Sequence, residues 1–389
     1  MKYDFDTIYD RRDSGCFKYD ALKMIYGRDD LIPLWVADMD FAVSPEIQAA
    51  IRSRTQHPIY GYNLRLPEFY DAVIDWQSKR FQWQIEKDWI IAVPGVVPAI
   101  ALAILGLTEP NDGVLIQTPV YAPFAATILA HHRTLITNPL IEDRGIYSID
   151  FADFESKISK ARLFILCNPH NPVGRVFNGE ELTRMGEICR RHQVSIFSDE
   201  IHADIVYEGF KHMPIASLPG MSDIVVTGFS PAKSFNIAGL STAIAVAENP
   251  KLRNPIHYLN QNLHIYLGNS IGIAALIAAY RDSEAWLEEL LAYLQGNRDY
   301  VSDYLSRHMP DIGMTPQEGT YLAWLDFRRT GLSDMELENM MLNDARIALN
   351  DGPGFGVEGR GFMRLNFACP RAVLTEALSR INKALKDRL

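Results

Sequence analysis

The stretch Ser230-Pro-Ala-Lys233-Ser-Phe-Asn-Ile-Ala-Gly-Leu240 contains the lysine on which the predicted fold of this chain depends. Two polar segments precede it, Asn168-Pro-His-Asn-Pro-Val-Gly174 and Ser198-Asp-Glu-Ile-His202. A lysine amine can form a Schiff base with a carbonyl compound, and a carboxylate can keep a ring nitrogen protonated. The three segments together predict an enzyme site built around Lys233.

Strands and helices are predicted to alternate from about residue 45 to about residue 280. Short apolar runs rich in β-branched residues predict buried strands over residues 89–93, 114–117, 163–167, 194–198, 224–227 and 242–247. Such alternation implies a mostly parallel sheet covered by helices on both faces. Lys233 follows the strand at 224–227, where a loop at the C-terminal end of a parallel sheet would hold it over a ligand crevice.

The pattern changes after residue 282. Ser283 is predicted to cap a long helix that runs to about His308. The elements predicted after it are a strand at 321–327, a helix from about 333, a strand at 362–367 and a helix from about 371. We therefore predict an N-terminal arm (1–45) that packs with the small domain, a large domain (46–282) and a small C-terminal α+β domain (283–389).

The composition argues against several classes of protein. A net charge of -10 argues against a nucleic-acid partner and an anionic membrane surface, because both need clustered basic residues. The longest apolar stretch, residues 96–107, is predicted to be a buried helix, because a membrane span needs ~20 residues. The four cysteines are scattered, which predicts reduced thiols and a cytoplasmic location. The histidines have no metal-ligand spacing, so no metal is predicted.

The three polar segments resemble the pyridoxal 5'-phosphate (PLP) site of the aspartate aminotransferase superfamily, fold type I, in order and rough spacing. The resemblance implies an α/β fold in which the large domain has a mostly parallel seven-stranded sheet between helices. It also implies that Lys233 forms the Schiff base and is catalytic. Asp199 would pair with the ring nitrogen, and Asn171 would donate to the phenolic oxygen. Taken singly, these residues could be a surface lysine, a helix-capping aspartate and a turn asparagine.

The same resemblance implies further cofactor contacts. Ser230 resembles the hydroxyl that binds the cofactor phosphate. Gly95, Val96 and Val97 lead from a predicted strand into a helix, whose free N–H groups suit a phosphate. Tyr121 resembles the aromatic residue that stacks on the pyridine ring, although a tyrosine near two prolines is more often loop packing.

Two more residues are implied to act at the edges of the site. Tyr60 resembles the tyrosine that reaches the phosphate of the neighbouring subunit, which implies a homodimer with shared active sites. Arg364 lies on a predicted strand that is otherwise apolar, and a buried arginine must be paired. The family uses an arginine here, beside Asn171, to bind the α-carboxylate of a small amino-acid substrate. The alternative is a structural ion pair with a nearby Asp or Glu.

A finer resemblance, over nearly the whole chain, is to the MalY/PatB-type C–S lyases, often called cystathionine β-lyases. The segments Phe17–Asp20, Leu34–Phe41 and Asp199–Asp204 all resemble that branch. His202 stands where many aminotransferases have a tyrosine near the ring oxygen, and Ser241 where they often have a phosphate-binding arginine. The branch implies α,β-elimination of L-cystathionine or a related cysteine thioether to a thiol (homocysteine), pyruvate and ammonia.

Other functions match parts of the sequence. An aminotransferase on the same fold and a PLP-bearing protein that mainly binds a regulatory partner remain alternatives. The Ser230–Lys233 spacing also occurs in serine β-lactamases, but their S-D-N and K-T-G motifs are missing from the sequence. Residues 354–359 match G-x-G-x-x-G but precede a predicted strand, whereas the dinucleotide fingerprint follows one. They are predicted to form a flexible loop near the substrate.

Overall fold

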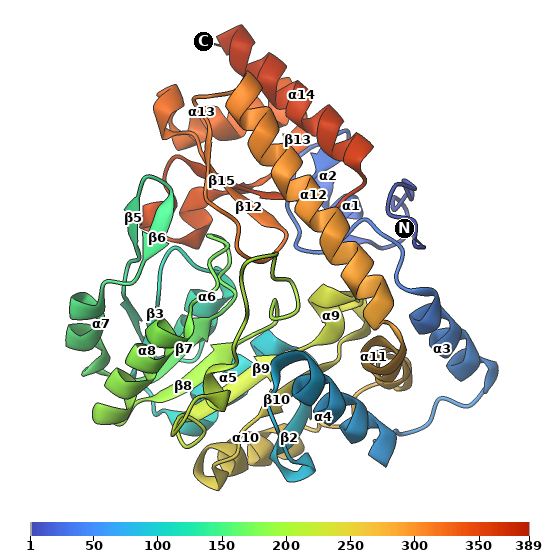
Figure 1. The fold of residues 1–389 in the computed structure, drawn as a ribbon, viewed down its shortest axis with the longest axis vertical. Coiled ribbons are helices and arrows are strands. Elements are labelled where there is room, and N and C mark those ends of the chain that lie inside the picture. Colours follow the sequence, from blue (N-terminus) through green and yellow to red (C-terminus); the bar gives the residue numbers. More distant parts are fainter. Residues whose placement is uncertain (1, 389) are drawn as a thin grey trace.

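A seven-stranded sheet forms the centre of the lower part of the molecule in Figure 1. The computed structural model describes residues 2–388. In sheet order the strands are β2 (Ile90–Val93), β10 (Ala243–Val246), β9 (Val225–Phe229), β8 (Ser195–Asp199), β7 (Ala161–Cys167), β3 (Gly113–Ile116) and β4 (Thr134–Thr137). Neighbouring strands are parallel, except that β10 is antiparallel to both β2 and β9. The predicted fold class is confirmed.

Six of these strands coincide, within two residues at each end, with the apolar runs in the sequence. The seventh strand, β4, has no such run. It lies at the edge of the sheet, and its residues are exposed or half-buried. An edge strand is covered less than a central strand, so it does not need a continuous apolar sequence. This is why β4 was not predicted.

Helices cover both faces of this sheet. The helices on one face are α5 (Val96–Leu107), α6 (Pro123–Ala130) and α10 (Pro250–Asn262). The helices on the other face are α7 (Phe151–Ile158), α8 (Gly179–Arg191) and α11 (Ser270–Asp282), with α3 (Pro45–Gln56) and α4 (Pro67–Phe81) packed against α11. The helix α5 is the one predicted over residues 96–107. Among residues 2–388, no helix has both the length and the apolar character needed to cross a bilayer.

A smaller antiparallel sheet lies above the first in Figure 1. Its strands, in order, are β11 (Gly313–Met314), β12 (Leu322–Asp326), β15 (Phe362–Asn366) and β14 (Asn350–Asp351). The helices beside it are α12 (Glu284–His308), α13 (Asp334–Asn339) and α14 (Arg371–Arg388). One prediction about α12 is wrong. Ser283 makes no capping hydrogen bond, because its hydroxyl donates instead to the Ala278 carbonyl at 3.0 Å.

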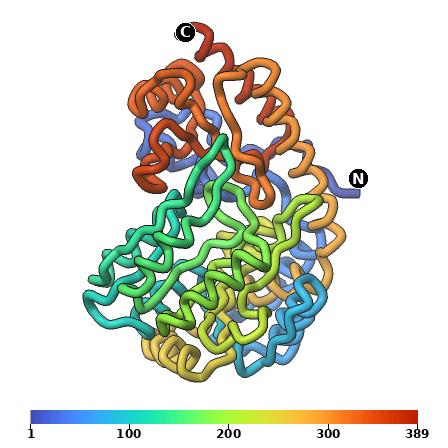
Figure 2. The backbone as a smooth tube through the Cα atoms, turned by 60° about the vertical axis from the view of Figure 1, so that its left-hand side comes forward, coloured from blue at the N-terminus to red at the C-terminus, as the bar shows by residue number. Residues whose placement is uncertain are grey.

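The N-terminal segment lies beside the C-terminal part of the chain, as the blue and the orange-red tubes in Figure 2 show. Its elements are α1 (Phe17–Asp20), α2 (Leu22–Tyr26) and β1 (Ile32–Pro33). The strand β1 pairs in parallel with β13 (Ile347–Ala348). A separate hairpin is formed by β5 (Ile141–Asp143) and β6 (Ile146–Ser148). The domain boundaries at residues 45 and 282 stay predictions.

One apolar core extends through both sheets. Phe235, two residues after Lys233, stacks on Trp286 of α12 with ring centroids 6.2 Å apart and 24° between the ring planes. It also meets Trp76 and Tyr280 edge-on. The segment that carries Lys233 is therefore held by side chains from both parts of the molecule.

Candidate active site

A cavity of about 220 Å³ lies at the carboxyl ends of the parallel strands. Residues that end or follow β2, β7, β8 and β9 line it. Open α/β sheets bind ligands at this edge. The predicted site residues that line the cavity are Gly95, Val96, Val97, Tyr121, Asn171, Asp199, His202, Ser230 and Lys233. Arg364 and Tyr60 are not part of this lining.

Lys233 lies on the four-residue helix α9 (Pro231–Ser234), directly after β9. A proline in the first turn favours the start of a helix there. The Ser230 hydroxyl caps it by accepting the Ala232 N–H at 3.0 Å. The same hydroxyl donates to the Thr242 carbonyl at 2.6 Å, which ties the helix start to the beginning of β10. Ser230 thus lines the cavity and also fixes the helix that presents Lys233.

The Lys233 side chain is half-buried, and its amine donates to the backbone carbonyl of Ala37. Burial, and then the charge of Arg364, lowers the pKa of this amine to about 8, although Asp38 and Asp199 oppose the shift. An ordinary exposed lysine is almost fully charged at neutral pH. A lysine with this pKa can lose its proton near neutral pH and act as a nucleophile or a base.

Asp199 ends β8 and is also buried. Burial raises the pKa of its carboxyl group to about 7, although the Ile201 N–H, which it accepts at 3.1 Å, opposes the shift, as does the charge of Lys233. Within the described chain, no salt bridge includes Asp199; the cation that acts on it is the neighbouring Lys233. A cationic group placed in the cavity would stabilise the ionised carboxylate.

Arg364, on β15, is a buried guanidinium group that pairs with no carboxylate among residues 2–388. Its Nη1 donates to Asn171 Oδ1 at 3.1 Å. Its Nη2 donates to the Trp35 carbonyl at 2.7 Å and to Asn350 Oδ1 at 2.5 Å, while Nε has no acceptor. Burial lowers the pKa of the guanidinium to about 10. The structural ion pair considered above is therefore not found, and Asn171 connects Arg364 to the cavity.

The remaining wall of the cavity combines an aromatic ring with a helix end. Tyr121 is half-buried, and this partial loss of water contact raises the pKa of its phenol. Gly95 precedes the first turn of α5, and no side chain caps this helix end. Since Pro98 has no N–H, the free donors of the first turn are those of Val96 and Val97. An uncapped helix N-terminus favours a bound anion such as a phosphate.

His202 packs against Tyr321, with ring centroids 5.8 Å apart and 76° between the planes. Its Nδ1 has no hydrogen-bond partner within residues 2–388. Burial lowers the pKa of His202 well below its usual value, so the ring is neutral. Ser241 also lines the cavity, with φ of 45° in the left-handed region. Neither side chain supplies a positive charge to the cavity.

Tyr60 does not reach the cavity within a single chain. It is 58% exposed, and its hydroxyl donates to the Thr55 carbonyl. It lines an open pocket that shares Pro94 and Ser241 with the cavity. The predicted contact between Tyr60 and the neighbouring subunit stays a prediction.

Sequence reasoning missed Ala37 and Cys167, which both line the cavity. Ala37 belongs to the segment Leu34–Phe41, so the resemblance of that segment was the available signal. Cys167 ends β7 and lies beside Asp199 in the sheet, and its Sγ accepts the N–H of Asn171 at 3.5 Å. Burial raises the pKa of this thiol, so it stays protonated.

The glycine-rich segment 354–359 lies beside Arg364. It forms parts of two short 3₁₀ turns, Gly352–Phe355 and Val357–Gly359. The Phe355 ring centroid is 5.0 Å from the Arg364 guanidinium carbon, a cation–π distance. The segment is therefore next to the site, and it is not a dinucleotide-binding turn.

The residues of the cavity suit PLP. Lys233 offers a primary amine for the aldehyde, and Asp199 offers a buried carboxyl group for a cationic ring nitrogen. Tyr121 offers an aromatic face, and the uncapped start of α5 offers donors for a phosphate. These four features occur in one cavity, and each matches a different part of the cofactor.

Comparisons with known proteins agree with this geometry. A family model described as "Aminotransferase class I and II" matches residues 29–381. "Cystathionine beta-lyase PatB" of Bacillus subtilis is 41% identical over 98% of this chain and 99% of its own length. "Protein MalY" of Escherichia coli is 31% identical over 99% of both. The crystal structure of cystalysin from Treponema denticola, which contains PLP, superposes with a TM-score of 0.97 at 35% identity over 100% of both chains.

The sheet, the cavity and the family match lead to the same assignment. This chain belongs to the aminotransferase class I and II family, and PLP is its cofactor.

Proposed function

We propose that this protein is a carbon–sulfur β-lyase that cleaves L-cystathionine or a related cysteine thioether. The products would be a thiol (homocysteine from cystathionine), pyruvate and ammonia. The names of PatB and the solved C–S lyase structures support the reaction class. The observation that carries the substrate class is Arg364, a buried guanidinium beside the cavity of Lys233 for which residues 2–388 offer no carboxylate partner.

Arg364 would bind the α-carboxylate of the amino-acid substrate. Its planar fork matches a carboxylate, and its present acceptors are neutral amide and carbonyl oxygens. A carboxylate would satisfy the charge that burial now leaves uncompensated. Asn171 would fix the guanidinium and also contact the cofactor, because it touches Arg364 and lines the cavity.

Lys233 would be the catalytic residue. Bound PLP supplies a protonated ring that accepts electrons from the bond broken at the substrate Cα. The free Lys233 Nζ would remove the Cα proton, a task for which a pKa of about 8 is suitable near neutral pH. The Asp199 carboxylate would keep a proton on the ring nitrogen by charge pairing.

The phosphate would be held by the N–H groups of Val96 and Val97 and by the Ser230 hydroxyl, whose hydrogen would turn from the Thr242 carbonyl to a phosphate oxygen. Tyr60 of a second copy would add a hydroxyl, which makes the enzyme a homodimer with shared sites. This is supported by the exposed apolar segment around Tyr60, where Tyr62 is 95% exposed. We also propose a cytoplasmic location, because all four cysteines are unpaired.

The test is pyruvate release from L-cystathionine by purified PLP-loaded protein without any keto acid. We expect pyruvate and free thiol in equal amounts. The family description favours an aminotransferase as the second candidate. Amino transfer that requires a keto acid, without pyruvate release from cystathionine alone, would replace the lyase with that candidate.

A further inference from the structure

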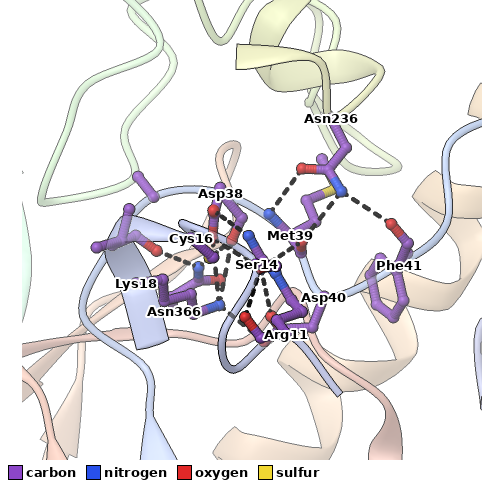
Figure 3. Close-up of polar contacts among 12 residues, drawn as sticks. Arg11, Ser14, Cys16, Lys18, Asp38, Met39, Asp40, Phe41, Asn236 and Asn366 are labelled. Atoms are coloured by element: carbon purple, nitrogen blue, oxygen red, sulfur yellow. Dashed lines mark hydrogen bonds and ion pairs between the residues drawn. The ribbon is translucent and has the colours of Figure 1, made fainter. Parts of the chain in front are cut away.

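Two segments that resemble the C–S lyases, residues 17–20 and 34–41, are not explained by the cavity, to which they contribute only Ala37. In the structure these segments contact each other. We call residues 35–41 the strap. Figure 3 shows that Asn236 contacts the strap from one side, and that Arg11, Lys18 and Asn366 contact it from the other.

Side-chain amides hold the strap backbone from both sides. On one side, Asn366 Nδ2 donates to the carbonyls of Val36 and Asp38, both at 2.6 Å. On the other side, Asn236 accepts the Met39 N–H at 3.0 Å and donates to the Met39 carbonyl at 3.0 Å. The strap therefore connects the smaller sheet to the segment that carries Lys233.

A compact ionic cluster fixes the carboxylates of the strap. Lys18 Nζ lies 2.7 Å from Asp40 Oδ2, and their side chains are 0% and 7% exposed. Arg11 lies 2.6 Å from Asp38 Oδ2 and 2.6 Å from Asp40 Oδ1. Two cations thus neutralise two carboxylates. Buried ion pairs often add little net stability, but they can select one geometry over others.

The cluster and the amides determine where the Ala37 carbonyl lies. Ala37 is between the two residues whose carbonyls Asn366 holds. Its own carbonyl accepts the Lys233 amine and, at 2.9 Å, the Tyr321 hydroxyl. A second, open cavity of about 620 Å³ lies along the strap, and both Ala37 and Lys233 line it as well as the first. The side chains of Trp35, Met39 and Phe41 anchor the strap in the apolar core, and the polar contacts add to this packing by fixing where its backbone carbonyls lie.

We propose that the strap is a positioning device for Lys233, in which the Ala37 carbonyl holds the free amine and the Lys18–Asp40 pair holds that carbonyl in place. The proposal rests on the role of Lys233 in the proposed function. Neither Lys18 nor Asp40 lines the cavity of about 220 Å³, so they are positioning residues. Their effect reaches the amine through the strap backbone.

The test uses a double variant that leaves the net charge unchanged, Lys18→Met with Asp40→Asn. The matched control is Arg175→Met with Glu181→Gln, which removes a similarly close pair (2.9 Å, 13% and 17% exposed) away from the strap. The full chain is stripped of PLP, and the rate of PLP recapture is followed by absorbance across a pH series. This rate depends on the neutral fraction of the free Lys233 amine. Deuterium exchange of the strap amides is measured on the same samples.

The Ala37 carbonyl stabilises the charged amine, so a displaced carbonyl should make the amine easier to deprotonate. We expect faster exchange of the strap amides in the double variant. We also expect the pH midpoint of recapture to fall by roughly half a unit, equivalent to weakening one hydrogen bond. The control should change neither. If the double variant does not fold, Asn366→Leu loosens the same carbonyls without touching the charges.

Two results would overturn the proposal. Faster strap exchange with an unchanged midpoint would show that the strap does not govern the amine. Unchanged exchange and an unchanged midpoint would show that the Lys18–Asp40 pair does not hold the strap. A failure of the wild-type chain to link PLP covalently is a different outcome, which would overturn the proposed role of Lys233 and the positioning role with it.

Discussion

Replacing Arg364 by methionine should abolish most activity at only a modest loss of stability. Burial lowers the pKa of Arg364 from 12.5 to about 10. Because the folded state disfavours the charge, the charged group weakens the fold at neutral pH by about 3 kcal/mol. Methionine removes this cost, but it also removes three charge-assisted hydrogen bonds to neutral oxygens, worth at least about 1.5 kcal/mol each. The two effects partly offset, so the free energy of unfolding should fall by about 1–2 kcal/mol.

The effect of Arg364→Met on catalysis should be large. A carboxylate held by two charge-assisted hydrogen bonds gains about 3–6 kcal/mol, and its loss lowers kcat/KM by about 10²- to 10⁴-fold. The assay is pyruvate release from L-cystathionine, with thermal unfolding measured on the same samples. The matched control is Arg175→Met, in which Glu181 and Glu318 lose their partner. That variant should lose about 1–3 kcal/mol of stability and keep most of its activity.

Either of two results would refute this reasoning about Arg364. If Arg364→Met lowers the free energy of unfolding by more than about 4 kcal/mol, Arg364 is mainly a structural residue. If kcat/KM falls by less than about threefold, less than 1 kcal/mol of binding energy is lost and Arg364 does not bind the substrate carboxylate.

Three further changes test the other assignments. The Lys233→Ala variant should release no pyruvate above background. After borohydride reduction, mass spectrometry should no longer find PLP covalently attached to the chain. PLP attached to another lysine would contradict the assignment. The folded-state pKa of Asp199 is raised from 3.8 to about 7, so the PLP-free protein should lose stability as pH rises from about 4 to 7. Thermal unfolding of the Asp199→Asn variant should not show this loss. If the variant and the wild type depend on pH in the same way, the shift is ruled out. Tyr60→Phe should weaken PLP binding about tenfold, as measured by equilibrium dialysis. The control, Tyr62→Phe in the same exposed segment, should have no effect on PLP binding. Equal effects of the two substitutions would exclude a specific contact between Tyr60 and the phosphate.

Much of the fold could be predicted because its signals are local. Central strands such as β3 and β10 are buried on both faces, and their sequences, Gly-Val-Leu-Ile and Ala-Ile-Ala-Val, contain no polar side chain. Asp199 ends β8 and Lys233 follows β9. Because the carboxyl ends of parallel strands meet at one edge of a sheet, the sequence predicted that the two residues lie at the same edge. The edge strand β4 lacks this constraint and was missed.

The rest of the site depends on contacts between distant parts of the chain. Whether Arg364 had a carboxylate partner could not be predicted, because its acceptors come from three separate segments. The Ala37 carbonyl was missed because a backbone acceptor has no residue type that marks it. Ser283 was expected to cap α12, but the Ala278 carbonyl, one turn earlier, takes its hydroxyl instead.

The stacking of Phe235 on Trp286 bears on how heat inactivates the enzyme. The segment that carries Lys233 cannot separate from helix α12 without exposing aromatic surface from a core that both sheets share. A core that is continuous in this way favours cooperative melting over the loosening of one part alone. Loss of activity and loss of structure should therefore coincide on heating. The C-terminal part of the chain should unfold at the same temperature as the segment that carries Lys233.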